Sequence, residues 1–195
     1  ATSTSTITSA SVASGATTTD QDAVVIDPSG VVYDSLTRLP VAGAIVTLKY
    51  NGVAVSNSWL DTALGTTNGS TTSANGAYNL FLNSNAPSGT YTLEITPPSS
   101  YVFQSTIISP ATGPYVPSLG GGTEYIQTQT TAPTGGQTTT YYLSFTFSIT
   151  GSLTTTSNGV ANNHIPLDPR PNLSVVKAGP STAVNGQTGL SYTLT

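Results

Sequence analysis

The stretch Tyr141-Tyr142-Leu143-Ser144-Phe145-Thr146-Phe147-Ser148-Ile149 decides the fold class. Its odd-numbered positions are all aromatic or aliphatic, whereas the positions between them are Tyr, Ser and Thr. Successive side chains of a β-strand point to opposite faces, so a period of two predicts a strand with one face on a core and the other in water.

Shorter stretches elsewhere show the same alternation, namely 44–50, 78–82 and 91–95, and none shows an apolar stripe at helical spacing. Asn-Gly pairs, which tolerate the positive φ of tight hairpins, punctuate these stretches at 51–52, 68–69, 75–76, 158–159 and 185–186. Residues 57–73 and 109–137 are irregular and rich in Gly, Thr or Pro, which predicts two long loops. The pattern predicts an all-β sandwich with long loops, extended terminal segments and little or no helix.

The composition excludes several classes of function. Only 6% of the 195 residues are charged, against about 25% in typical soluble proteins, and four Lys and Arg in total leave no basic surface for nucleic acid or anionic lipid. The absence of Cys excludes disulfides and thiolate chemistry, and no apolar run is long enough to span a membrane. The lack of Met and the small residue Ala1 fit a chain exported after loss of a signal peptide, although a boundary set for another reason fits equally.

Three motifs in order resemble a known family. Residues 30–34 (GVVYD) with 39–48 (LPVAGAIVTL), then 74–80 (ANGAYNL) and 88–93 (SGTYTL), are similar to the opening, hairpin and strand signatures of carboxypeptidase-regulatory-like domains. The resemblance covers residues 24–102. It implies a prealbumin/immunoglobulin-like sandwich related in shape to the collagen-adhesin B-type and Sdr B-type repeats of bacterial surface proteins. Many B-type repeats carry a Lys–Asn isopeptide bond. Neither Lys49 nor Lys177 stands at the family's lysine position, so we expect no such crosslink.

The C-terminal stretch 172–195 resembles the first strands of a conserved surface repeat of unknown function, cut short. We therefore predict three parts. Residues 1–22 form a Ser/Thr-rich extension, residues 23–168 form the carboxypeptidase-regulatory-like sandwich, and residues 169–195 form a linker and the first strands of an incomplete immunoglobulin-like repeat.

No catalytic residues are predicted, so we expect the protein not to be an enzyme. His164 is the sole histidine, and the sequence contains no Gly-x-Ser-x-Gly nucleophile elbow. Glu94 is expected on the outward face of its strand, and Glu124 in a Gly-rich loop without a partner, so paired-carboxylate chemistry is not expected.

Two binding alternatives remain open. Asp20, Asp22 and Asp27 form the only acidic cluster and are the candidates for calcium, although they lack a calcium-loop motif; we otherwise expect no cofactor. Trp59, in a predicted loop, is the candidate for stacking on a sugar, because its ring offers a flat apolar face.

The function expected from these observations is that of a structural module in a bacterial extracellular surface protein or fibre. Its partners would be copies of itself in a head-to-tail homopolymer, or neighbouring repeats of the same protein. Residues 1–19 or 172–195 would add a strand to the sheet edge of the next copy. The alternative is a carbohydrate-binding or adhesion module that uses loop aromatics.

Overall fold

A computed structural model describes residues 28–117, 122–126, 140–149, 158–171, 177–179, 181–182, 184–186, 188–189 and 193–194. The calcium candidates Asp20, Asp22 and Asp27 and the N-terminal extension 1–22 lie outside these ranges. No helix among the described residues is both long and apolar enough to cross a membrane.

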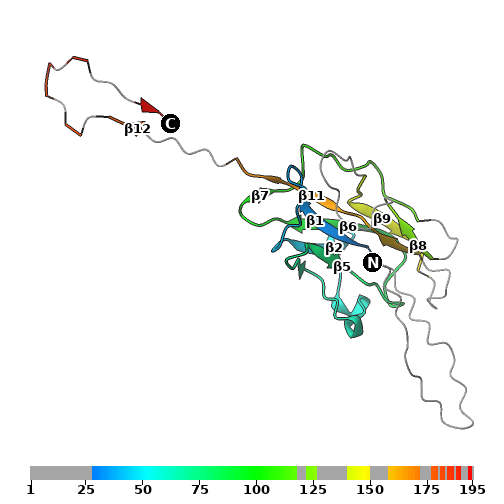
Figure 1. The fold of residues 1–195 in the computed structure, drawn as a ribbon. Helices are drawn as coiled ribbons and strands as arrows, with labels where there is room; N and C mark the ends of the chain where they lie inside the picture. Colours follow the sequence, from blue (N-terminus) through cyan, green and yellow to red (C-terminus); the bar gives the residue numbers. More distant parts are fainter. Residues whose placement is uncertain are drawn as a thin grey trace, which may run out of the picture.

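Two sheets face each other as a sandwich, which confirms the predicted all-β fold class (Figure 1). The first sheet has the order β5 (Ala77–Asn79), β1 (Ser29–Asp34), β11 (Ile165–Pro169) and β7 (Tyr101–Val102). The second has the order β3 (Val53–Ala54), β2 (Ile45–Tyr50), β6 (Gly89–Thr96) and β9 (Ser144–Phe147), and β4 (Ser70–Thr71) also pairs with β2. β1 and β11 run parallel, with Val32 opposite Ile165, and the other pairs in these sheets are antiparallel.

In the second sheet, the core lies on the face of β2, β6 and β9 that the alternation of their residues predicts to be buried. Val46 and Leu48 on β2, and Tyr91, Leu93 and Ile95 on β6, are all buried in one cluster. Phe145, Phe147 and Ile149 join that cluster from the second half of the 141–149 stretch, as does Tyr141 from its start. The side chains between them in β6 are exposed, so the second sheet presents one apolar face inward. In the first sheet, β1 and β11 have three consecutive buried residues each and do not alternate.

Turn chemistry at Asn51 and Gly52 explains the hairpin between β2 and β3. Both residues have positive φ, 50° and 78°, and they form a two-residue loop, which is the type I′ arrangement that Asn-Gly favours. The predicted loop 57–73 contains two short 3-10 turns, η1 (Asn57–Trp59) and η2 (Thr62–Leu64), as well as β4. The described residues contain no α-helix.

Three predictions about local structure were wrong. The ladder of β9 covers only Ser144–Phe147 and not the whole predicted stretch 141–149, because the backbone of Tyr142 pairs with the side chain of Asn163. Leu143 is partly buried and packs against the core. The predicted loop 109–137 contains β8 (Gly122–Tyr125), which pairs in parallel with β10 (Asn158–Ala161). Glu124 therefore lies in a strand and not in a loop. The sequence of β8 does not alternate between apolar and polar residues. The strand is recognised only by its pairing with β10.

β12 (Lys177–Ala178) and β13 (Thr193–Leu194) form a separate antiparallel pair beyond the sandwich. β7 and the end of β11 lie at one end of the sandwich, from which the chain continues toward β12, and β8 lies toward the other end (Figure 1).

Candidate functional site

Asn163, fully buried in the turn between β10 and β11, joins the two sheets. Its backbone N–H donates to the Ser29 carbonyl at 3.0 Å, within the first sheet. Its carboxamide pairs with the backbone of Tyr142, just before β9: Oδ1 accepts from the Tyr142 N–H at 2.8 Å, and Nδ2 donates to the Tyr142 carbonyl at 3.0 Å. A side-chain amide thus makes the two hydrogen bonds that a neighbouring strand would make.

Tyr78 on β5 closes this arrangement. Its hydroxyl donates to the Asn163 carbonyl at 2.7 Å and accepts from Asn163 Nδ2 at 3.1 Å. Both polar groups of the asparagine and the tyrosine hydroxyl are therefore hydrogen-bonded in the core, as buried polar groups must be to avoid a large desolvation cost.

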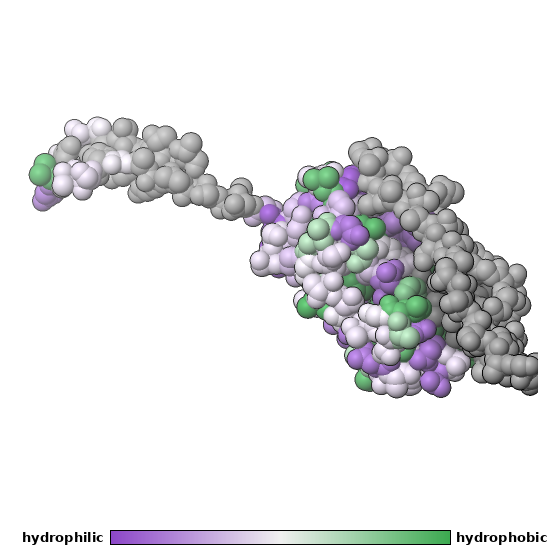
Figure 2. All heavy atoms as spheres, turned by 60° about the horizontal axis from the view of Figure 1, so that its bottom comes forward, coloured by the Kyte–Doolittle hydropathy of each residue, from purple (hydrophilic) through white to green (hydrophobic). Residues whose placement is uncertain are grey.

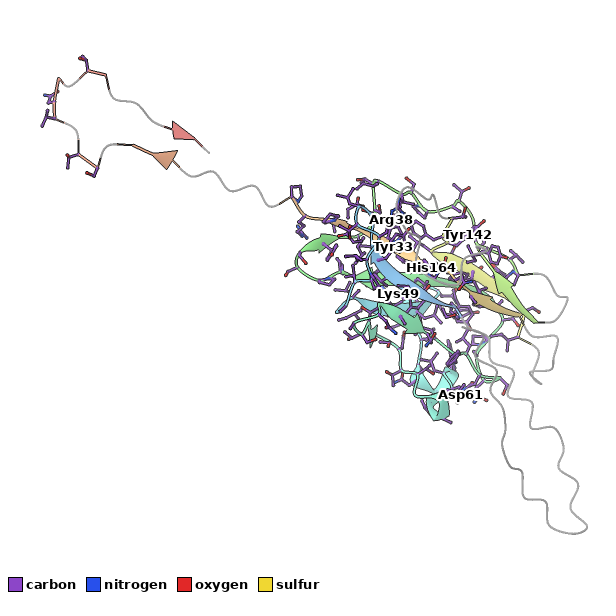
Figure 3. All side chains as sticks on the ribbon, viewed as in Figure 1. Tyr33, Arg38, Lys49, Asp61, Tyr142 and His164 are labelled. Carbon is purple, nitrogen blue, oxygen red and sulfur yellow. The ribbon has the colours of Figure 1, made fainter. Side chains whose placement is uncertain are left out.

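His164 follows directly and fills a place in the β1 ladder. Its Nδ1 accepts a hydrogen bond from the Val31 N–H at 3.1 Å, and the residue is only 1% exposed. The ring nitrogen takes the position of a backbone carbonyl where the chain bends between β10 and β11. Figure 3 shows the imidazole within the sandwich, on the strand segment that leads into β11. This geometry requires Nδ1 to be unprotonated, since it acts as the acceptor.

Asn68 performs the same task at the edge of the second sheet. Its Oδ1 accepts from the Leu48 N–H at 2.8 Å, and its Nδ2 donates to the carbonyls of Leu48 and Val55 at 2.9 and 3.0 Å. The carboxamide therefore fills the gap on β2 between β3 and β4. The sequence around Asn68 matches a glycosylation sequon, but both ends of the amide are hydrogen-bonded to the backbone in this fold.

Asp168 anchors the segment 103–117, which crosses from the first sheet to the second. Its Oδ1 accepts from the hydroxyls of Ser35 and Ser105 at 2.7 and 2.5 Å, and its Oδ2 accepts from the Thr106 N–H at 2.7 Å and hydroxyl at 3.1 Å. Burial opposes ionisation of this carboxyl, but the hydrogen bonds outweigh it, and the pKa of Asp168 is lowered.

The anchored segment then covers the outer edge of β9. Ala111 N–H donates to the Tyr141 carbonyl at 2.8 Å, Tyr115 N–H donates to the Ser144 carbonyl at 2.9 Å, and Thr146 N–H donates to the Tyr115 carbonyl at 2.9 Å. The outward backbone groups of β9 at Ser144 and Thr146 are thereby paired within the chain, which limits the row of unpaired groups that an edge strand would otherwise expose.

Trp59, the sugar-binding candidate, packs against the core from the η1 turn. Its ring meets the ring of Tyr50 edge-on, with centroids 5.8 Å apart and planes at 84°, and the residue is only partly exposed. Tyr50 in turn contacts Tyr91 at 5.0 Å, so the indole is the outermost member of an aromatic cluster that reaches into the core. Most of its apolar contact is made within the protein.

The remaining sequence candidates are dispersed. Glu94 is exposed on β6, as predicted, and forms an ion pair with Lys49 across the β2–β6 ladder. No group of three or more His, Cys, Asp or Glu side chains lies together among the described residues. A hollow of about 320 Å³ lies where β6 begins and β9 ends, next to Val116 and Pro117; its lining is mainly apolar and includes no ionisable side chain.

No family model matches the chain, and neither the curated proteins nor the solved structures include a significant match to it. The family resemblance of residues 24–102 therefore stays a prediction, while the sandwich itself is established by the structure. Sequence reasoning missed Asn163, Asn68 and Asp168 as organising residues. The pair Asn162-Asn163 directly before a buried strand was the one available signal.

We predict that Asn163→Asp lowers the free energy of unfolding at pH 7 by about 3 kcal/mol or more. The substitution removes the Nδ2 donor to Tyr142 and Tyr78 and buries a charge without a counterion. Urea denaturation measures the loss. Asn79→Asp, at an exposed position on β5, is the matched control and is expected to change stability by about 0.5 kcal/mol at most. Equal losses in the two variants would contradict the assigned role of Asn163.

Asp168 gives a prediction about acid stability. Because its folded-state pKa lies below the unfolded value of about 4, its stabilising contribution is present above that pH and is lost as pH falls through the folded value. We expect Asp168→Asn to be less stable than the parent by about 1–2 kcal/mol at pH 7, from the lost charge-assisted hydrogen bonds. The difference should close at the acid end of a series of thermal melts. A difference that stays constant below about pH 4 would refute this role.

Proposed function

We propose that this chain is a structural module of a bacterial extracellular surface protein or fibre. The observation that carries the proposal is the use of its polar side chains. The carboxamides of Asn68 and Asn163, the imidazole of His164 and the carboxylate of Asp168 all hydrogen-bond to backbone or hydroxyl groups of other segments. These side chains stabilise the sandwich. A stable module of this kind can bear force and keep its neighbours at a fixed distance, and neither task needs a reactive side chain.

The surface supports the same proposal. Pale, near-neutral residues occupy much of the face in Figure 2, with apolar and strongly hydrophilic side chains in small separate groups. A net charge of −4 over 195 residues gives little repulsion between copies at close approach. We extend the proposal to the predicted family, a carboxypeptidase-regulatory-like sandwich of the kind found in large surface proteins, on the strength of the motifs at 30–48, 74–80 and 88–93.

Contact between copies by strand addition needs an edge that accepts a strand. The β9 edge is covered by residues 111–115, and the β2 edge is filled by β3, β4 and Asn68. β5, at the end of the first sheet, is the acceptor that we propose, since no described strand pairs with its outer side. The candidate donors are residues 1–19 and 172–195.

Electron microscopy of the full chain tests this function. We expect negatively stained particles that lengthen with protein concentration, and we expect deletion of the donor segment, residues 1–19 or 172–195, to abolish the lengthening. Labelling of intact cells with antibody against the chain should show it outside the cell envelope. A solitary monomer at every concentration, together with antibody access only after permeabilisation, would overturn the proposal.

Trp59→Ala separates this function from carbohydrate binding. Because the indole packs on Tyr50, we expect the substitution to cost about 2 kcal/mol of stability and to leave retention on a glycan array unchanged from background. Val53→Ala, at an exposed position on β3, serves as the control for handling and labelling. Retention of the parent on a defined glycan, lost in a folded Trp59→Ala variant, would establish the adhesion alternative.

A further inference from the structure

Three Asn-Gly pairs lie in parts of the sandwich whose side chains the structure describes, at 51–52, 68–69 and 75–76. An Asn that precedes Gly is prone to cyclise, because glycine has no side chain to hinder the approach of its backbone nitrogen to the Asn carboxamide. The reaction needs a carboxamide that is free to move, a Gly N–H that no hydrogen bond holds, and access for water. The fold supplies these conditions unequally to the three pairs.

The fold protects Asn68 through its carboxamide. Oδ1 and Nδ2 are bonded to the backbone of Leu48 and Val55, and the Gly69 N–H donates to Asn68 Oδ1 at 3.1 Å. Loss of Nδ2 as ammonia would leave the carbonyls of Leu48 and Val55 without this donor. Cyclisation at Asn68 therefore breaks several hydrogen bonds at once, and each is costly to leave unmade.

The fold protects Asn75 mainly through the glycine that follows it. The Gly76 N–H, which would be the nucleophile, donates to the Ser73 carbonyl at 2.8 Å. Asn75 Oδ1 accepts from the Ser73 hydroxyl at 2.7 Å and from the Ala77 N–H at 3.1 Å. Gly76 is also buried, and a Cβ at this position would clash with the Val32 carbonyl oxygen. The chain cannot rearrange here unless β1 moves.

The pair Asn51-Gly52 has neither form of protection. Both residues are exposed, and they form the two-residue loop between β2 and β3. Within the described part of the chain, no hydrogen bond engages the Asn51 carboxamide. Apart from its chain neighbours, no described atom lies within 4 Å of the place that a Cβ on Gly52 would take. The carboxamide is free to turn toward the Gly52 nitrogen, and water reaches both groups.

We propose that Asn51 is a site of spontaneous deamidation in the folded protein, in contrast to Asn68 and Asn75. The Gly52 nitrogen attacks Cγ of Asn51. The new N–Cγ bond forms, the Cγ–Nδ2 bond breaks, and Nδ2 leaves as ammonia with the proton of the Gly52 N–H. Water then opens the cyclic imide at either of its carbonyls, which gives aspartate or isoaspartate. Water is the only co-reactant.

The isoaspartate product changes the edge of the second sheet. Its backbone passes through the former side-chain carboxyl group, so residue 51 loses the left-handed conformation that the two-residue loop requires. β3 is held on β2 by two residue pairs only, Lys49 with Ala54 and Tyr50 with Val53. Since the turn sets the register of a hairpin, β3 is released and the backbone of β2 becomes an open edge. This modification goes beyond the proposed structural function and does not rest on it.

Peptide mapping by mass spectrometry of the full chain, after incubation at mildly alkaline pH, tests the proposal. We expect aspartate and isoaspartate at residue 51, the latter detected with isoaspartyl methyltransferase, and unchanged Asn at 68 and 75. In urea the three sites should react at similar rates, because the fold no longer protects two of them. Gly52→Ala should slow the reaction at Asn51 severalfold. Gly65→Ala is the matched control, since Gly65 also has positive φ and open space but follows Leu64.

Two results would overturn the deamidation site: Asn68 or Asn75 reacting as fast as Asn51 in the folded chain, or Asn51 reacting in urea but not in the folded chain. Hydrogen–deuterium exchange of the isoaspartate fraction, separated by ion exchange, tests the effect on the edge. We expect faster exchange at residues 53–55 than in the unmodified chain, and equal rates would contradict the release of β3. Neither readout involves fibre growth, so this proposal and the structural function fail in separate experiments.

Discussion

The buried carboxamide of Asn163 is the interaction on which the rest of the structure depends. The backbone of Asn163 bonds to β1, and its side chain bonds to Tyr142. The residue therefore fixes the spacing of the two sheets as well as the position of β9. The packing around it is tight: a Cβ on Gly30 would come within 2.7 Å of the Asn163 carbonyl carbon. Only glycine at position 30 allows that approach, and β1 can then pair with both of its neighbours.

The same solution recurs around the sandwich. Among the described residues, Asn68 beside β2 and His164 beside β1 each supply a hydrogen-bond partner where a ladder has a gap, and Asp168 holds the 103–117 segment. A chain with few charges and no disulfides can still be rigid in this way, because each buried amide bond to the backbone is hard to replace by water. The structural function that we propose would require sheet edges held in this way.

Sequence reasoning predicted what depends on local periodicity. The alternation in 44–50, 91–95 and 145–149 gave the correct core-facing residues, and Asn51-Gly52 gave the correct hairpin, since both signals arise from neighbours along the chain. It failed at β8, whose sequence does not alternate, and at Tyr142, whose backbone is taken by a side chain distant in sequence. The site could not be predicted for the same reason. Asn163 is separated in sequence from Tyr142 by 21 residues and from Tyr78 by 85.

The sequence by itself therefore determined the fold class, the inward faces of the main strands and the near absence of charge, because those follow from residue type and spacing. Only the tertiary structure decided which polar residues close the ladders and that Trp59 packs against the core. Those outcomes depend on which backbone groups, distant in sequence, remain unpaired after the strands have assembled. The pattern of residue types along the chain does not contain that information.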